Sequence, residues 1–140
     1  MALAQSGAGG QGVGDRVMRA SDALPLVYSC SGCSNVAQLA NSVALRLDRA
    51  GLAEMSCIVG VGGQVPPLVN KARSGRRIVA LDGCPLQCVQ ACLRLHDLTA
   101  DVHVVLSQLG LRKRFGVDCG ESEMELVFSR VVGLMEVGCG

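Results

Sequence analysis

The sequence predicts a single-domain α/β fold of three layers, Rossmann-like or flavodoxin-like, with a mostly parallel sheet of about four strands. The chain has 140 residues and 49% of them are apolar, which is enough for one domain with a single core. From residue 25 onward, short apolar runs alternate with longer amphipathic ones, a pattern typical of repeated strand–helix units. We expect residues 25–140 to form this domain and residues 1–24, rich in glycine, serine and alanine, to form a flexible tail.

Strands and helices are expected to alternate along the domain. The first strand is followed by a helix with apolar residues at i, i+3, i+4 and i+7 spacing, with Ser34 or Asn35 as its cap and Gly51 beyond its end. The second helix starts at two prolines, and the third has Pro85 in its first turn, where proline is tolerated. The expected elements are strand 26–30, helix 34–50, strand 55–62, helix 66–75, strand 76–83, helix 85–98, strand 101–110 and helix 121–135.

The charge balance excludes some classes of partner. With 13 basic and 12 acidic residues, the formal net charge is +1, which lacks the excess of cations that nucleic-acid binding requires. The basic run "LRKRFG" at 111–116 is expected to be a solvated turn. No apolar run reaches the roughly 18 residues that span a bilayer. We therefore expect neither nucleic acid nor a membrane as a partner.

The cysteine content points to metal or redox chemistry. Eight cysteines in 140 residues would suit either a secreted disulfide scaffold or an intracellular metal or redox protein. Residues 1–24 lack the basic region followed by a continuous apolar region that marks a signal peptide. We therefore expect a cytoplasmic protein, in which thiols stay reduced and are free to bind a metal or to react.

Two pairs of cysteines follow two of the expected strands. Cys30 and Cys33 form a CxxC turn, and Cys84 and Cys88 are four residues apart, which would place them on one face of a helix. Because ligands gather at the carboxyl ends of parallel strands, we expect the four thiols to meet there. Four thiolates suit zinc, and the same ligands suit iron or an iron–sulfur cluster.

The other cysteines are assigned other roles. Cys57 is expected to be buried in the middle of its strand, since free cysteine is among the most buried residue types. Cys92 is one turn beyond Cys88, where it either packs against the sheet or serves as a reserve ligand. Cys119 and Cys139 are given no role.

Some polar residues also stand near the expected site. Asp82 is expected to cap the third helix, with support of the residues around a ligand thiolate as the alternative. His96 is expected to be a solvated helix residue, whereas His103 is expected to be a structural histidine, with a contribution to the metal site as the alternative. The run "GVGG" at 60–63 is expected to form a tight turn, because it lacks the rest of a phosphate-binding motif.

Four motifs, in the order "CSGCSNVAQLAN", "MSCIVGVGG", "LDGCPLQC" and "HVVLSQLG", resemble the DGC-domain family of zinc-binding proteins. The family is named for an Asp-Gly-Cys motif, present here as Asp82, Gly83 and Cys84, and the resemblance covers about residues 26–112. In some members the second cysteine of the first motif is replaced, so three thiolates with an open position are an alternative to four. The resemblance implies zinc binding by Cys30, Cys33, Cys84 and Cys88.

These features support several functions. The first is a metal-binding module that handles or senses a metal ion or docks a protein partner. The alternatives are a thiol–disulfide redox protein in which Cys30 attacks and Cys33 resolves, and electron transfer through an iron–sulfur cluster. The residues give no reason to expect an enzyme, because no general base other than His103 is expected near the cysteines.

Overall fold

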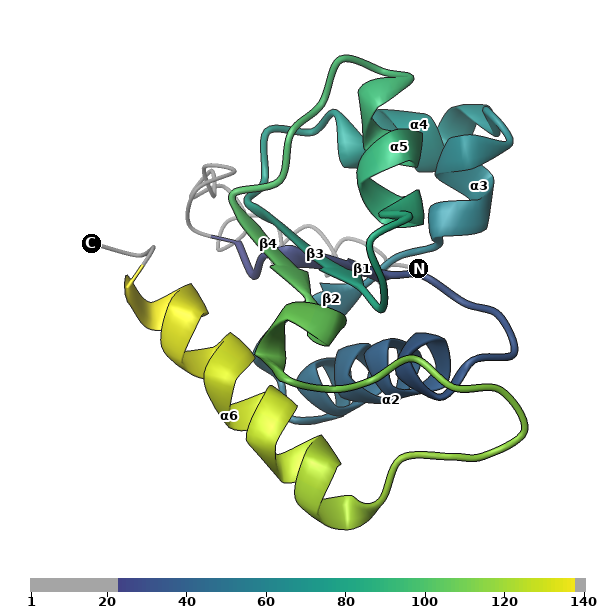
Figure 1. The fold of residues 1–140 in the computed structure, drawn as a ribbon. Coiled ribbons are helices and arrows are strands. Elements are labelled where there is room, and N and C mark those ends of the chain that lie inside the picture. The colour runs from purple at the N-terminus through teal and green to yellow at the C-terminus, as the bar shows by residue number, and fades with distance from the viewer. Residues whose placement is uncertain (1–22, 138–140) are drawn as a thin grey trace, which may run out of the picture.

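The computed structural model describes residues 23–137, so almost all of the expected tail and also Cys139 lie outside the described residues. Within them, a four-stranded sheet has the order β2-β1-β3-β4, and every neighbouring pair is parallel. Figure 1 shows the sheet at the centre of the molecule. The predicted α/β fold with a parallel sheet is confirmed. The strands are β1 (Leu26–Ser29), β2 (Glu54–Met55), β3 (Ile78–Asp82) and β4 (Val102–Val105).

Helices cover both faces of the sheet, which makes three layers. On one face α2 contacts β1 and β3 while α6 contacts β4, and on the other face α5 packs on β3 with α3 and α4 beside it. None of the helices between residues 23 and 137 combines the length and apolarity that crossing a membrane needs. The helices are α2 (Asn35–Arg49), α3 (Ile58–Gly62), α4 (Pro66–Ala72), α5 (Cys88–Arg94) and α6 (Glu121–Val137).

The two central strands end side by side. All residues of β1 and β3 are buried, and their register pairs Ser29 with Leu81 at the carboxyl end. The helix that follows β1 lies on one face of the sheet and the helix that follows β3 lies on the other. The chain therefore diverges at this point, and such a switch point is where ligands bind in open parallel sheets.

The first predicted helix is confirmed together with both of its ends. The hydroxyl of Ser34 caps α2 by accepting from the N–H of Ala37 at 3.1 Å. Beyond the last turn, Gly51 has a φ of 74°, a conformation that glycine adopts without steric cost. The capped start of α2 directly follows the CxxC turn, so the position of this turn is fixed relative to the helix.

The second predicted strand is wrong over most of its length. Only Glu54–Met55 pairs with β1, and Ile58–Gly62 forms the helix α3 instead. Two glycines allow this helix to pack closely, since a Cβ on Gly60 would overlap Leu68 and one on Gly62 would lie 2.8 Å from the sulfur of Cys92. Tertiary packing therefore outweighs the strand preference of the β-branched residues, and "GVGG" ends a helix rather than forming a free turn.

The third helix and the fourth strand also differ from the prediction at one end each. Helix α5 begins at Cys88 rather than at Pro85, because Gln87 has a φ of 51° and interrupts the helical run. Strand β4 ends at Val105, and a 3-10 turn over Leu106–Leu109 follows it. Cys84 therefore lies in the loop before α5, so Cys84 and Cys88 do not share a helical face as predicted.

Candidate metal centre

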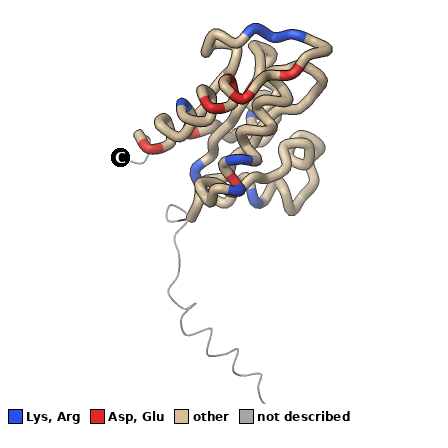
Figure 2. The backbone as a smooth tube through the Cα atoms, turned by 90° about the horizontal axis from the view of Figure 1, so that it is seen from below, with Lys and Arg blue, Asp and Glu red and all other residues tan. Residues whose placement is uncertain are grey.

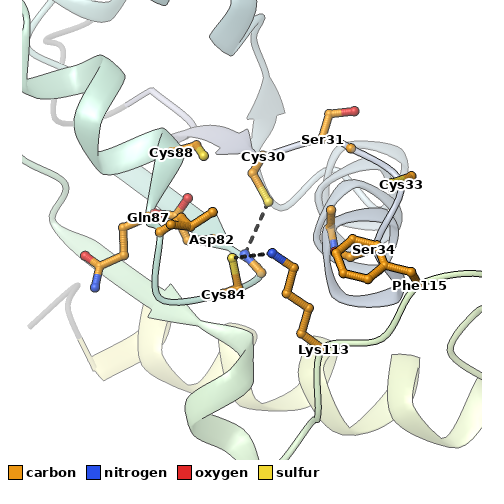
Figure 3. A pocket seen from close by; sticks show the side chains of 14 residues that line it. Cys30, Ser31, Cys33, Ser34, Asp82, Cys84, Gln87, Cys88, Lys113 and Phe115 are labelled. Carbon is orange, nitrogen blue, oxygen red and sulfur yellow. Dashed lines mark hydrogen bonds between the residues drawn. The ribbon is translucent and has the colours of Figure 1, made fainter.

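All four predicted ligand cysteines line one pocket at the carboxyl ends of β1 and β3. They come from two segments, the CxxC turn between β1 and α2 and the loop between β3 and α5. The segment after β4 supplies Lys113 and Phe115 to the same pocket. Figure 3 shows these side chains around it. The prediction that two cysteine clusters meet at this edge of the sheet thus agrees with the structure.

Cys30 is the buried one of the four cysteines that line the pocket. Its side chain is buried, and the backbone N–H of Gly83 donates to its sulfur at 3.2 Å. Burial raises the pKa of the Cys30 thiol, and the negative charge of Asp82 adds to the rise, while the hydrogen bond from Gly83 lowers the pKa without reversing the shift. A buried thiol with a raised pKa is a poor nucleophile, because little of it is ionised. A metal ion bound to the sulfur would lower that pKa and release the proton to solvent.

Cys84 lies beside a cation that comes from outside the cysteine motifs. The ammonium Nζ of Lys113 is 3.5 Å from the Cys84 sulfur. Figure 3 shows the sulfurs of Cys30 and Cys84 and the Lys113 nitrogen pointing toward one another. The expectation that 111–116 is a solvated turn is therefore wrong for Lys113, although Arg112 and Arg114 are exposed. The basic run is visible in the sequence, but the run alone does not indicate that it lies beside the cysteines in the folded chain.

Cys33 and Cys88 are exposed, although both line the pocket. The sulfur of Cys33 points away from those of Cys30 and Cys84 in Figure 3. Between residues 23 and 137, no three side chains of Cys, His, Asp and Glu stand close enough to hold one metal ion. The fold thus brings the four cysteines to one pocket without gathering their sulfurs around one point.

Asp82 organises the loop that carries Cys84 and Cys88. Its carboxylate is 1% exposed and accepts from the N–H groups of Val89 at 2.7 Å and Gln90 at 3.3 Å, at the start of α5. The Nε2 of His103 on β4 lies 2.8 Å from the same carboxylate. Asp82 thus caps α5 as expected, although it lies before the cap position, which Gln87 occupies. His103 hydrogen-bonds to this pocket-lining carboxylate.

Each residue of the Asp-Gly-Cys run has a distinct structural role. Asp82 holds the start of α5, and Cys84 faces the pocket. Gly83 lies so close to the first turn of α2 that a Cβ there would be 2.8 Å from the carbonyl carbon and oxygen of Val36. Only glycine allows this approach, which also puts the Gly83 N–H on the sulfur of Cys30.

Other predicted side chains lie away from the pocket. Cys57 is exposed rather than buried, and its sulfur caps α3 by accepting from the N–H of Gly60 at 3.4 Å. Cys92 is partly buried against the core and lies beside Gly62 of α3. His96 is buried rather than solvated, with Nε2 at 2.8 Å from the carbonyl oxygen of Val61. The sulfur of Cys119 contacts the carbonyl of Asn35 at 3.7 Å.

The donor set of the pocket suits a soft metal ion. Thiolates are the preferred ligands of zinc, copper(I) and iron–sulfur clusters, and nitrogen donors already point at two of the sulfurs, from Gly83 and Lys113. Because the sulfurs are not gathered, binding of one ion by all four would require the side chains of Cys33 and Cys88 to turn inward. Both are exposed, so solvent rather than packed atoms surrounds them.

The chain is similar to a known protein and to a known domain family. The chain is 62% identical over 117 residues to the anaerobic and virulence modulator AnvM of Pseudomonas aeruginosa, a match that covers 84% of this chain and 89% of the relative. No solved structure matches the chain. The DGC domain matches residues 26–131, a range that starts with β1 and ends within α6. With its Asp-Gly-Cys run built into the pocket and this match over most of its length, the chain belongs to the DGC-domain family.

Proposed function

We propose that this protein binds one zinc ion through cysteine thiolates in the pocket and acts as a regulatory module rather than as an enzyme. The observation that supports zinc binding is that Cys30, Cys33, Cys84 and Cys88 line one pocket at the switch point of the sheet. Cys30 and Cys84 are the core of the proposed site, because each already accepts a hydrogen bond from a donor that would also serve a metal-bound thiolate. Cys88 and Cys33 complete it.

The regulatory role is extended from the relative, whose name describes it as a modulator. A module of this kind would report the presence of metal to a protein partner, since a metal that draws Cys33 and Cys88 inward changes the surface around the pocket. A cytoplasmic location remains part of the proposal, because thiolate ligands require a reducing compartment.

The thiol–disulfide alternative is less well supported by the geometry. The attacking thiol in a CxxC motif has to be accessible and easily ionised. Here the first cysteine, Cys30, is buried and has a raised pKa, while Cys33 is exposed and points away from it. An iron–sulfur cluster would use the same ligands as zinc and is distinguished by composition alone.

The experiment is elemental analysis of the full chain purified without oxygen, with zinc, iron and sulfide measured per chain. We expect about one zinc, lost in Cys30→Ser and Cys84→Ser and weakened in Cys33→Ser. Cys57→Ser is the matched control, because it removes an exposed thiol outside the pocket. Full zinc in the Cys30→Ser, Cys84→Ser double variant would contradict the proposal. Iron with sulfide would instead establish the cluster, and disulfide reductase activity without metal would establish the redox alternative.

A further inference from the structure

The basic loop, Arg112–Phe115, is clamped by one buried side chain. The amide Nδ2 of Asn35 donates to the carbonyl of Arg112 at 3.0 Å, and its Oδ1 accepts from the N–H of Arg114 at 2.6 Å. The backbone N–H of Asn35 also donates to the carbonyl of Arg114 at 2.9 Å. Asn35 is 2% exposed, so these bonds are sheltered from water. The backbone is therefore held on both sides of Lys113.

This clamp separates the side chains of the basic loop into two directions. Phe115 forms an antiparallel bridge with Ser34, and in extended chain successive side chains point to opposite sides. Lys113 and Phe115 line the pocket, with the Lys113 ammonium 5.3 Å from the Phe115 ring centroid, whereas Arg112 and Arg114 are exposed. The three cations are the continuous blue stretch in Figure 2. Of these three, Lys113 is the one aimed at the thiols.

A thiolate site for a divalent ion has a charge that needs compensation. Three thiolates with one divalent ion carry a net charge of −1 and four carry −2. Negative charge in a partly buried pocket is costly unless a cation or a hydrogen-bond donor lies beside it. Lys113 supplies both at the Cys84 sulfur, as the Gly83 N–H supplies a donor at Cys30. Although an ammonium repels the metal ion itself, the thiolates outnumber the metal charges, so the net effect favours loading.

We propose that Lys113, aimed by Asn35, is the charge-compensating residue that sets the affinity of this pocket for its metal ion. The proposal rests on the proposed function and adds a residue to it that lies outside the cysteine motifs. Lys113 contacts the ligand Cys84 and stabilises the loaded site, and Asn35 is a positioning residue that acts through Lys113.

The test is the zinc dissociation constant of the full chain, measured by competition with a chromophoric chelator under reducing conditions. Lys113→Met should weaken zinc binding by about 10-fold to 100-fold, the range typical of partners that hydrogen-bond to metal ligands. Lys113→Arg keeps the charge and should restore affinity to within a few fold. Arg112→Met is the matched control. It removes a positive charge from the neighbouring residue, whose side chain is exposed, and should leave the zinc affinity almost unchanged.

Asn35→Ala tests the clamp independently. It should weaken zinc binding in the same direction, and the Asn35→Ala, Lys113→Met double variant should bind no more weakly than Lys113→Met alone, because both changes remove one interaction. Circular dichroism reports whether each variant is folded. Wild-type affinity in Lys113→Met, or equal weakening in Arg112→Met, would overturn the role of Lys113 while leaving the zinc site intact. A wild-type chain that binds no zinc would overturn the site and the role together.

Discussion

The carboxylate of Asp82 and the imidazole of His103 are joined at 2.8 Å between Oδ2 and Nε2, across the neighbouring strands β3 and β4. The same carboxylate accepts from the N–H groups of Val89 and Gln90. One buried side chain thus connects the last strand of the sheet to the start of α5, and the loop between β3 and α5 carries Cys84. The cysteine loop is fixed at its base even though its thiols face the pocket.

Asp82→Asn should therefore destabilise the fold. The amide of asparagine keeps one oxygen but replaces the other with an NH₂ group, which is a donor. This NH₂ group cannot accept from the N–H groups of α5, so at least one hydrogen bond to the carboxylate is lost. The free energy of unfolding in urea should fall by about 2 kcal/mol or more. Asp97→Asn is the matched control, because Asp97 is exposed and has a φ of 58°, which asparagine tolerates. Equal losses in the two variants would contradict the buried role of Asp82.

Gly83→Ala should be costly for a different reason. Its Cβ would lie 2.8 to 2.9 Å from backbone atoms of Val36 and Ala37, which cannot move without shifting the start of α2. We expect a loss of about 1–3 kcal/mol in urea unfolding. The same substitution at Gly133, in α6 with no atom within 4 Å of the added Cβ, should instead stabilise by about 0.5–1 kcal/mol. A neutral Gly83→Ala would show that the two segments are not in close contact.

Cys30 should make stability depend on pH in the alkaline range. Its pKa is raised by burial above the 9.0 of a free thiol, so the folded protein keeps the proton longer than the unfolded chain does. The stabilisation is complete below pH 9 and is lost as the pH rises through the folded pKa, at no more than about 1.4 kcal/mol per pH unit. Urea unfolding between pH 8 and 10.5, with chelator and reductant, should show a steeper decline for wild type than for Cys30→Ala. Parallel declines would contradict the raised pKa.

Cys57→Ser should stabilise α3. The Cys57 sulfur already occupies the cap position with a 3.4 Å contact to the N–H of Gly60, and a serine hydroxyl is a preferred cap. We expect a gain of up to about 1 kcal/mol in urea unfolding, whereas Cys57→Ala should lose stability because it removes the acceptor. A loss of stability in Cys57→Ser would mean that the thiol makes apolar contacts which the hydroxyl cannot replace.

The sequence predicted the central strands and α2 correctly because their signals are local. Continuous apolar runs predict β1 and β3 as strands buried on both faces, and helical spacing with Ser34 and Gly51 predicts both ends of α2. The segment from Ile58 to Gly62 could not be assigned correctly on the same grounds. Its apolar run suits a strand, and only the close approach of Gly60 to Leu68 and Gly62 to Cys92 explains why it is a helix.

By itself, the sequence determined the parallel sheet and the meeting of two cysteine clusters at one edge, because the carboxyl ends of parallel strands share an edge whatever the details of packing. Tertiary structure decided which side chains reach the pocket. Lys113 is 29 residues away from Cys84 along the chain. The backbone on both sides of Lys113 is hydrogen-bonded to Asn35, which lies in a different element. Contacts between such distant segments leave no local pattern in the sequence, because they arise only once the elements have packed.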